Sequence, residues 1–175
     1  MQPDPVSAVV DGHELVLTSH AGDGSAWTVL AATLALADAL RSAGRVPAEV
    51  EWPDAVTLPR TMCGGAGTVQ RVARAREVDA VLEVRVQLTG SSLDLPSGRT
   101  SVWAEGGAAD AEPLTEAYAL ALAGRLAQLR AGDPALAGDY RQRCVTMGRL
   151  VDEPAGSYVS GVDAGGGLVL TALNG

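Results

Sequence analysis

A glycine-rich segment at residues 62–67 (Met-Cys-Gly-Gly-Ala-Gly) is a place in this sequence where phosphate chemistry could occur. Backbone N–H groups of such a segment can surround a phosphate. A phosphate-binding loop also ends in Gly-Lys-Ser/Thr, which supplies a cation and a magnesium ligand. That ending is missing here. We therefore expect a glycine-lined bend between two strands.

Histidine and cysteine side chains offer no suitable set of metal ligands. His13 and His20 flank a short apolar stretch, but no acidic or cysteine partner stands at ligand spacing, so both are expected on the surface. Cys63 and Cys144 are far apart and match neither a zinc spacing nor a redox pair. Two free thiols fit a reducing cytosol. The sequence thus predicts a cytoplasmic protein without a metal site.

The charge composition excludes several classes of partner. The 175 residues carry a formal net charge of −8 and include no lysine. No Lys/Arg cluster is present, which argues against nucleic acid and against an anionic membrane surface. No stretch has the apolar length of a membrane helix, and the N-terminus lacks the basic region of a secretory signal. An apolar content of 47% suffices for one domain with a small appendage.

The first half of the chain alternates strand and helix signals. Residues 14–18 read as a strand entered through a turn at residues 11–12. A helix is expected over residues 27–43, with Ser25 as its N-cap and Gly44 as a left-handed residue after its last turn. Residues 48–52 form a short strand that Pro53 ends, because proline removes a ladder donor.

The middle of the chain predicts a β-hairpin followed by a loop. Leu82, Val84, Val86 and Leu88 alternate with Glu83, Arg85 and Gln87 between residues 78 and 89. Residues 68–72 would form the other strand, although residues 69–74 fit a helix equally well. Residues 90–107 are rich in Ser and Gly, and we expect Trp103 to anchor this loop.

Two helices and a hairpin are expected in the last third. The first helix has an apolar stripe that runs to Gly132, formed by Leu114, Tyr118, Leu122, Leu126 and Leu129. Asp133 and Pro134 begin the second, which should stop near residues 147–148 and expose its charged run 139–143 to solvent. Residues 158–162 and 168–171, joined by a turn, form a small hairpin that cannot bury itself alone.

Four motifs in this order resemble the biotin–protein ligase family, most closely its actinobacterial type. Residues 51–54 (Glu-Trp-Pro-Asp) resemble its Lys-Trp-Pro-Asn-Asp signature, and residues 95–102 resemble its Leu-Pro-x-x-Ala-Thr-Ser-Leu loop. Residues 139–148 are similar to its Asp-Tyr-Arg-x-Arg-Cys/Ser-x-Thr-Leu/Ile-Gly run. Residues 161–168 are similar to its Gly-Ile-Asp-x-x-Gly-x-Leu hairpin. The resemblance covers roughly residues 13–175 and indicates common ancestry.

This resemblance implies an α+β fold in which helices pack on a mixed or antiparallel sheet. Residues 1–147 would form the catalytic-type domain without its N-terminal part. The family's Gly-Arg-Gly-Arg loop belongs to that missing part. Residues 148–175 would form a partial SH3-like hairpin or barrel. The family makes biotinyl-adenylate from biotin and ATP and transfers biotin to a carrier lysine. That chemistry needs positive charge around the new anhydride.

The positions that serve this chemistry in the family are changed here. The signature lysine is Glu51, and reversing a charge beside phosphate costs about 4 kcal/mol at 4 Å and an effective dielectric near 20. The family's Gly-x-Gly-x-Asn strand aligns with residues 83–87, so two side chains project where the family has none. A second family lysine aligns near Met62. The degenerate adenylate-pocket positions are Trp52, Pro53, Asp54, Gly64, Gly65 and Gln87.

Three functions remain open on these residues. The several losses favour a catalytically inactive relative that binds a protein and needs no cofactor. Its partner would be a true ligase, a carrier domain or a second copy of the chain. An active or split biotin–[carboxyl carrier protein] ligase would instead use biotin and ATP. A decayed reading frame would have no selected role.

Overall fold

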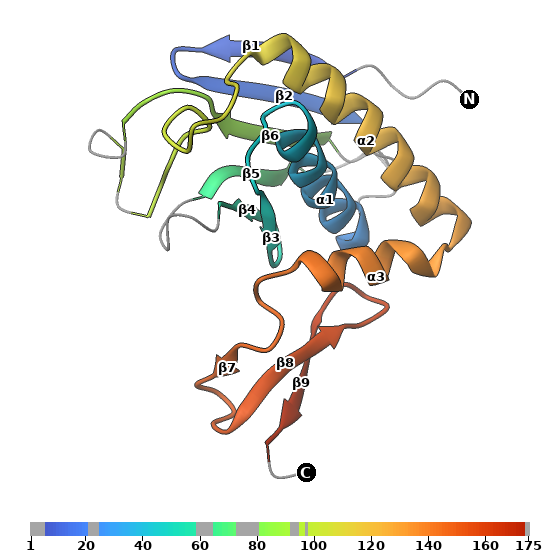
Figure 1. Cartoon of the computed structure of the whole chain (residues 1–175). Coiled ribbons are helices and arrows are strands. Elements are labelled where there is room, and N and C mark those ends of the chain that lie inside the picture. Colours follow the sequence, from blue (N-terminus) through green and yellow to red (C-terminus); the bar gives the residue numbers. More distant parts are fainter. Residues whose placement is uncertain are drawn as a thin grey trace.

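The computed structural model describes residues 6–20, 25–58, 65–72, 81–91, 95–96 and 98–173, with the backbone alone for residues 65–72. Within these ranges the chain forms two antiparallel sheets and three helices, as expected for an α+β fold (Figure 1). The larger sheet has the strand order β1-β2-β6-β5-β4-β3. Its strands are β1 (Ser7–Asp11), β2 (Glu14–His20), β3 (Glu49–Glu51), β4 (Ala55–Thr57), β5 (Gly65–Val72) and β6 (Val81–Gln87).

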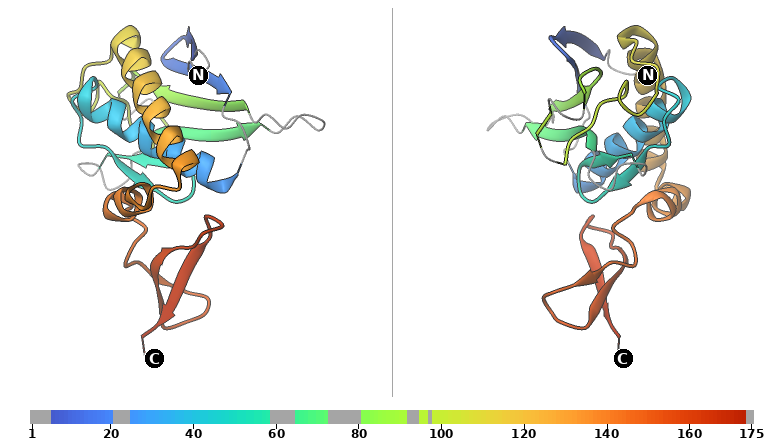
Figure 2. Two further views of the ribbon diagram at one scale, coloured as in Figure 1. Left: turned by 90° about the vertical axis from the view of Figure 1, so that its right-hand side faces the viewer. Right: turned by 60° about the vertical axis from the view of Figure 1, so that its left-hand side comes forward.

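The helices lie on one face of this sheet, and the smaller sheet projects beyond them (Figure 2). Helices α1 (Ala26–Ser42) and α2 (Ala111–Ala131) run beside each other, and α3 (Pro134–Arg143) leads to the smaller sheet. That sheet contains β7 (Leu150–Val151), β8 (Ser157–Val162) and β9 (Leu168–Ala172) in this order. The boundary at residue 147 and the SH3-like character of the smaller sheet stay predictions.

Helix α1 forms the centre of the core. Its alanines allow close packing, and residues on nearly every side of the helix are buried, including Leu34, Leu36 and Leu40. Ser25 caps its first turn as predicted, since the Ser25 side chain accepts a hydrogen bond from the Thr28 N–H. A helix buried all round needs apolar neighbours on every side. The sheet and α2 supply them.

The sequence correctly predicted α2 and the β5–β6 hairpin. Leu114, Tyr118, Leu122 and Leu126 of α2 are buried, and Gly132 ends the helix with φ 64°. Strand β5 pairs antiparallel with β6, which decides for a strand where a helix fitted equally well. Residues 62–64 of the glycine-rich segment lie outside the described residues, whereas Gly65 begins β5 and is not part of a bend.

Two helix ends differ from the prediction. Gly44 was expected to be left-handed, but the left-handed residue is Arg45, with φ 56°. Glycine is needed at position 44 for space, because a Cβ there would lie 2.7 Å from the Leu40 carbonyl oxygen. Helix α3 ends at Arg143, several residues early, because Cys144 is extended and forms a parallel bridge with Val50.

Two surface expectations are wrong, and one strand was missed. Trp103 does not anchor its loop, since its side chain is 60% exposed while Val102 and Ser101 are fully buried. The charged run after Asp139 is not wholly solvated, since Arg143 is largely buried. Strand β1 was not predicted, although the turn after it was. No helix within the described ranges is long and apolar enough to cross a membrane.

Candidate functional site

The turn after β3 faces the smaller sheet, and Glu51 is paired across this junction. Glu51 Oε1 accepts a hydrogen bond from Arg149 Nη1 at 2.7 Å. Arg149 directly precedes β7. Both side chains are partly exposed, so the pair adds at most about 1 kcal/mol to stability. Its main consequence is chemical, because the charge at position 51 is negative and is matched by a cation of this chain.

Trp52 and Trp27 together hold the turn between β8 and β9. The Trp52 indole Nε1 donates to the Gly166 carbonyl oxygen at 3.0 Å, and the Trp27 Nε1 donates to the Asp163 carbonyl oxygen at 3.1 Å. A Cβ at Gly166 would lie 2.7 Å from the Ala26 Cβ, so this close approach requires glycine. The indole of Trp52 therefore serves as a docking point for the hairpin.

Helix α3 and the segment that follows it contribute to the same junction. Tyr140 is fully buried and meets Trp27 edge to face, with 6.1 Å between the ring centroids. The Val145 N–H donates to the Val50 carbonyl oxygen, and Thr146 Oγ1 accepts from the Trp52 N–H at 3.0 Å. Residues 139–148 thus connect α3, the end of β3 and the smaller sheet.

The remaining positions of the turn add no positive charge. Pro53 is exposed and Asp54 is partly buried. Burial raises the pKa of the Asp54 carboxyl group above its usual range, partly offset by a backbone hydrogen bond. Together with Glu51, the turn contributes two carboxyl groups in four residues. An anionic ligand would gain no attraction from either of them.

Glu83 and Arg85 occupy the sheet face that the helices leave open. They alternate along β6 with the buried residues Leu82, Val84 and Val86. Arg85 Nε donates to Glu83 Oε1 at 2.7 Å, and its Nη1 lies 3.5 Å from Glu14 Oε2. The side chains of residues 83 and 85 therefore project from this face, as expected from the sequence, and they bind each other.

The strand registers put Glu51 and Arg85 in one row across the sheet. The row contains Val9, Val16, Arg85, Thr68, Ala55 and Glu51. Arg85 and Glu51 are three strand spacings apart, which is about 14 Å. Arg85 therefore cannot replace Arg149 as the partner of Glu51.

The other predicted pocket positions are not gathered at the turn. Gln87 also lies three strands away, and its amide donates to the Thr89 carbonyl oxygen at 2.8 Å. Gly65 pairs with Thr57 at the start of β5. Gly64 lies outside the described residues. The structure thus brings together Glu51, Trp52, Pro53 and Asp54, and separates them from Gln87.

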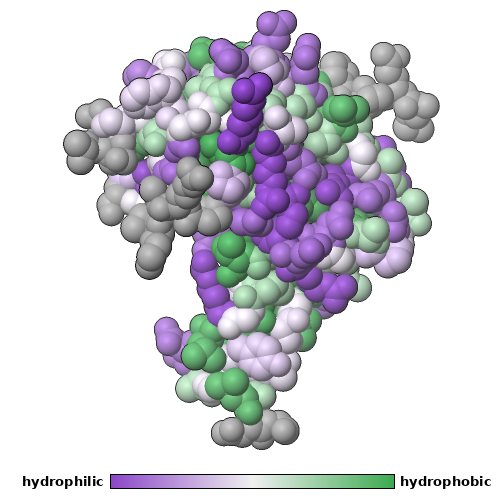
Figure 3. Space-filling model, viewed as in Figure 1, coloured by the Kyte–Doolittle hydropathy of each residue, from purple (hydrophilic) through white to green (hydrophobic). Residues whose placement is uncertain are grey.

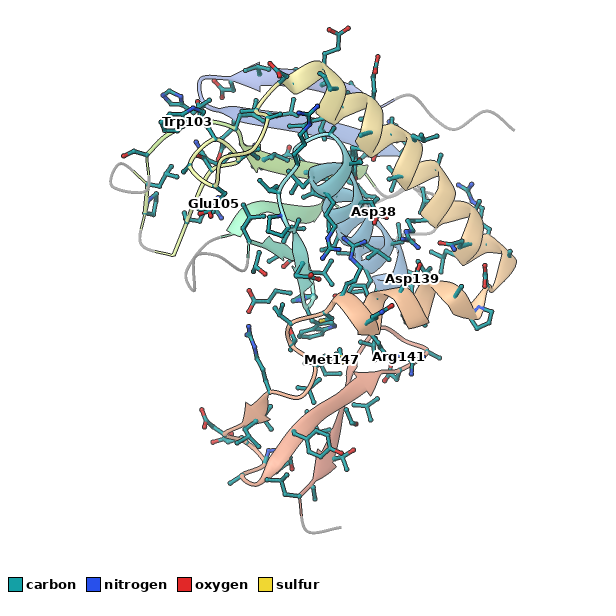
Figure 4. The ribbon with its side chains drawn as sticks, viewed as in Figure 1. Asp38, Trp103, Glu105, Asp139, Arg141 and Met147 are labelled. Carbon is teal, nitrogen blue, oxygen red and sulfur yellow. The ribbon has the colours of Figure 1, made fainter. Side chains whose placement is uncertain are left out.

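The sequence did not predict an ion-pair network between the three helices. Arg125 Nη2 lies 2.9 Å from Asp38 Oδ2, and Arg125 Nη1 lies 2.6 Å from Asp139 Oδ2. Arg143 also pairs with Asp38. Figure 4 shows Asp38 and Asp139 close to each other where the helices meet. The available signal was Asp38 itself, the one carboxylate within a mainly apolar helix.

The described part of the chain contains no group of three or more His, Cys, Asp or Glu side chains that could hold a metal ion. An open, mainly apolar hollow of about 310 Å³ lies where α2 turns into α3. Trp27, Leu129, Pro134, Leu136, Ala137 and Ala164 are among the residues that line it. The hollow offers little hydrogen bonding to a ligand.

Solved structures reveal a likeness in fold that sequence comparison does not. No protein-family model matches the chain, and no curated protein matches its sequence. The biotin protein ligase of Aquifex aeolicus matches its structure with a TM-score of 0.75 and 11% identity. The match covers 93% of this chain and 77% of the other. The chain has the biotin protein ligase fold.

Two other solved structures agree with this conclusion. A biotin protein ligase-like protein of unknown function from Silicibacter sp. matches with a TM-score of 0.75 and 19% identity, over 95% of this chain and 78% of that one. The Aquifex aeolicus ligase in complex with biotin and ATP matches with a TM-score of 0.73 and 12% identity, over 93% and 73%. At these identities the likeness shows the fold alone. The actinobacterial type stays a prediction.

Within this biotin protein ligase fold, Trp52→Phe should loosen the hairpin. The variant keeps an aromatic ring but loses the hydrogen bond to Gly166, which is worth about 1 kcal/mol. Amide hydrogen exchange in β8 and β9 should become about 5-fold faster. Trp103→Phe is the matched control, because Trp103 is exposed and no change is expected there. Equal effects of the two variants would contradict the docking role of Trp52.

Proposed function

We propose that this protein is a catalytically inactive relative of biotin protein ligases that acts in the cytoplasm through protein binding, with a ligase, a carrier domain or a second copy as its partner. The observation that carries the proposal is the Glu51–Arg149 ion pair. The position of the signature lysine holds a carboxylate, and that carboxylate is engaged with the smaller sheet. The residues of the turn thus have a task in joining two parts of the chain, and this task needs neither biotin nor ATP.

The charges around the turn support inactivity. Glu51, Asp54, Glu83 and Glu14 place carboxyl groups on the turn and the open sheet face. Arg85 is paired with Glu83 and Glu14, and Arg149 is paired with Glu51. A triphosphate or an adenylate is anionic and would meet these carboxylates. One such contact at 4 Å costs about 4 kcal/mol at an effective dielectric near 20. We therefore expect no cofactor.

Biotin transfer tests the proposal directly. The purified chain, incubated with labelled biotin, magnesium and ATP, should label no carrier domain, whether or not extract from its own cells is added. A biotin protein ligase of known activity serves as the positive control. Biotin, ATP and biotinyl-adenylate should not change the melting temperature of the chain. Tight binding of biotinyl-adenylate would overturn inactivity, and transfer only with extract would establish a split ligase.

Glu51→Lys is expected to leave the chain inactive. The substitution restores the charge of the family signature, but Glu83, Arg85 and Asp54 remain unchanged. Glu51→Gln is the matched control, because it breaks the pair with Arg149 without reversing the charge. Transfer by Glu51→Lys and not by Glu51→Gln would show that one substitution alone had abolished activity.

A further inference from the structure

Helix α2 presents an outer face opposite to the side that packs in the core. Its buried leucines and Tyr118 follow one side of the helix, and Figure 2 shows α2 on the outside of the helical layer. Residues three and four positions apart lie on the same side of a helix. By this spacing the outer face contains Glu112, Glu116, Leu120, Ala123, Gly124, Ala127 and Arg130.

Leu120 stands in the middle of this outer face. With 78% of its surface exposed, it is the most exposed large apolar residue in the described part of the chain. Most of the surface over the helices is hydrophilic (Figure 3). A Cβ at Gly124, one turn further on, would meet no atom within 4 Å. Both residues line an open hollow of about 410 Å³. A leucine from another helix would therefore find room above Gly124.

The charges of the outer face are separated along the helix. Glu112 and Glu116 lie in its first two turns, and Arg130 lies in its last turn. All three side chains are exposed, and none of them takes part in an ion pair within the described residues. An antiparallel copy of the same face would bring the acidic end of one helix beside the basic end of the other. The face is thus complementary to itself, as a two-fold interface requires.

We propose that two copies of this chain pair through α2, antiparallel about a two-fold axis at the level of Leu122. Leu120 then lies over Gly124 of the partner subunit. Arg130 lies between Glu112 of the partner subunit and Glu116 of the partner subunit, about 3 Å along the helix from the position of each. The proposal rests on the protein-binding function given above and names its partner.

The net charge of −8 opposes this association, so the contacts across α2 must overcome it. At physiological ionic strength, exposed charges more than about 8 Å apart are largely screened from each other. The charges that meet across the axis are closer than this and opposite in sign. A single helix face buries less surface than a stable dimer needs, and interfaces below about 1,200 Å² belong to weak complexes. We therefore expect a dissociation constant of about 100 µM.

Charge exchange separates the local contacts from the effect of net charge. Sedimentation velocity from about 10 to about 500 µM should show the unchanged chain passing from monomer to dimer. Arg130→Glu alone, and Glu112→Arg with Glu116→Arg, should each stay monomeric, because like charges then meet. In the second variant each substitution adds two positive units, so its net charge is only −4. An equal mixture of the two variants should dimerise, because both contacts then join opposite charges.

The contact at Leu120 is tested by a separate pair of variants. Leu120→Lys should raise the dissociation constant at least about 10-fold, because a charge then replaces the apolar contact over Gly124 of the partner subunit. Val9→Lys is the matched control, since Val9 is also exposed, at 63%, but lies on β1. This control should leave the dissociation constant unchanged. Circular dichroism shows whether each variant is folded.

Several results would overturn the pairing. They are a monomer at every concentration, a variant of net charge −4 that dimerises more tightly than the unchanged chain, and folded charge variants whose mixture stays monomeric. A chain that stays monomeric but binds a carrier domain or a true ligase would also overturn it. Biotin transfer distinguishes the two proposals, because a monomer that transfers no biotin refutes only the dimer. An α2 dimer that does transfer biotin refutes only inactivity.

Discussion

Asp38→Ala should lower the free energy of unfolding by about 3 kcal/mol. Asp38 of α1 pairs with Arg125 of α2 and with Arg143 of α3, and the side chains of both arginines are only 15% exposed. Removing the carboxylate leaves two mostly buried guanidinium groups facing each other. Arg143 already has two buried nitrogen atoms, Nε and Nη2, without a hydrogen-bond partner. The loss should appear as a lower midpoint in urea unfolding.

Glu49→Ala is the matched control for Asp38→Ala. Glu49 pairs with Arg41, whose side chain is 41% exposed, and water can replace the lost contact. This variant should cost at most about 1 kcal/mol. A similar loss in both variants would mean that the helix network contributes no more than an ordinary surface ion pair.

Gly107→Ala should destabilise the protein by about 3 kcal/mol, because the loop before α2 has no room for a methyl group. A Cβ at Gly107 would lie 2.5 Å from the Gly44 carbonyl oxygen and 2.5 Å from Val46 Cγ1. The loop is held there by a hydrogen bond from the Ala108 N–H to the Gly44 carbonyl oxygen at 2.8 Å. The added methyl group must push this loop away from the end of α1. Thermal unfolding would measure the loss.

Gly124→Ala is the opposite case in the same protein. Gly124 lies on the exposed side of α2, and a Cβ there meets no atom within 4 Å. Alanine is the better helix former, so stability should rise by about 1 kcal/mol. A gain at Gly124 and a loss at Gly107 would confirm that the space around each glycine decides the sign. Losses at both would contradict it.

Elements with strong local signals could be predicted from the sequence. The apolar stripe of α2 and its final glycine, the cap at Ser25 and the alternation of β6 each depend on neighbouring residues. The end of α3 could not be predicted in this way, because Cys144 leaves the helix to bridge with Val50, far away in the chain. Long-range pairing overrides local helical preference at this point.

The candidate site shows the same division. Motif order predicted the fold and drew attention to Glu51, but it could not reveal Arg149 as the partner of Glu51. That pairing depends on how the smaller sheet docks. The solvated face expected at residues 139–143 was wrong for a related reason. Asp139 and Arg143 face carboxylates and guanidinium groups of two other helices, which periodicity within α3 does not show.

The junction at Glu51 also constrains the order in which substitutions could be reversed. A lysine restored at position 51 would lie beside the guanidinium group of Arg149, so two cations would meet where an ion pair now joins the sheets. Arg149 would have to change first, and that step alone would leave Glu51 without its cation. Under the proposed descent from an active ligase, neither single step restores that activity while the open face keeps Glu83 and Arg85. Such a descent would therefore be hard to reverse by single substitutions.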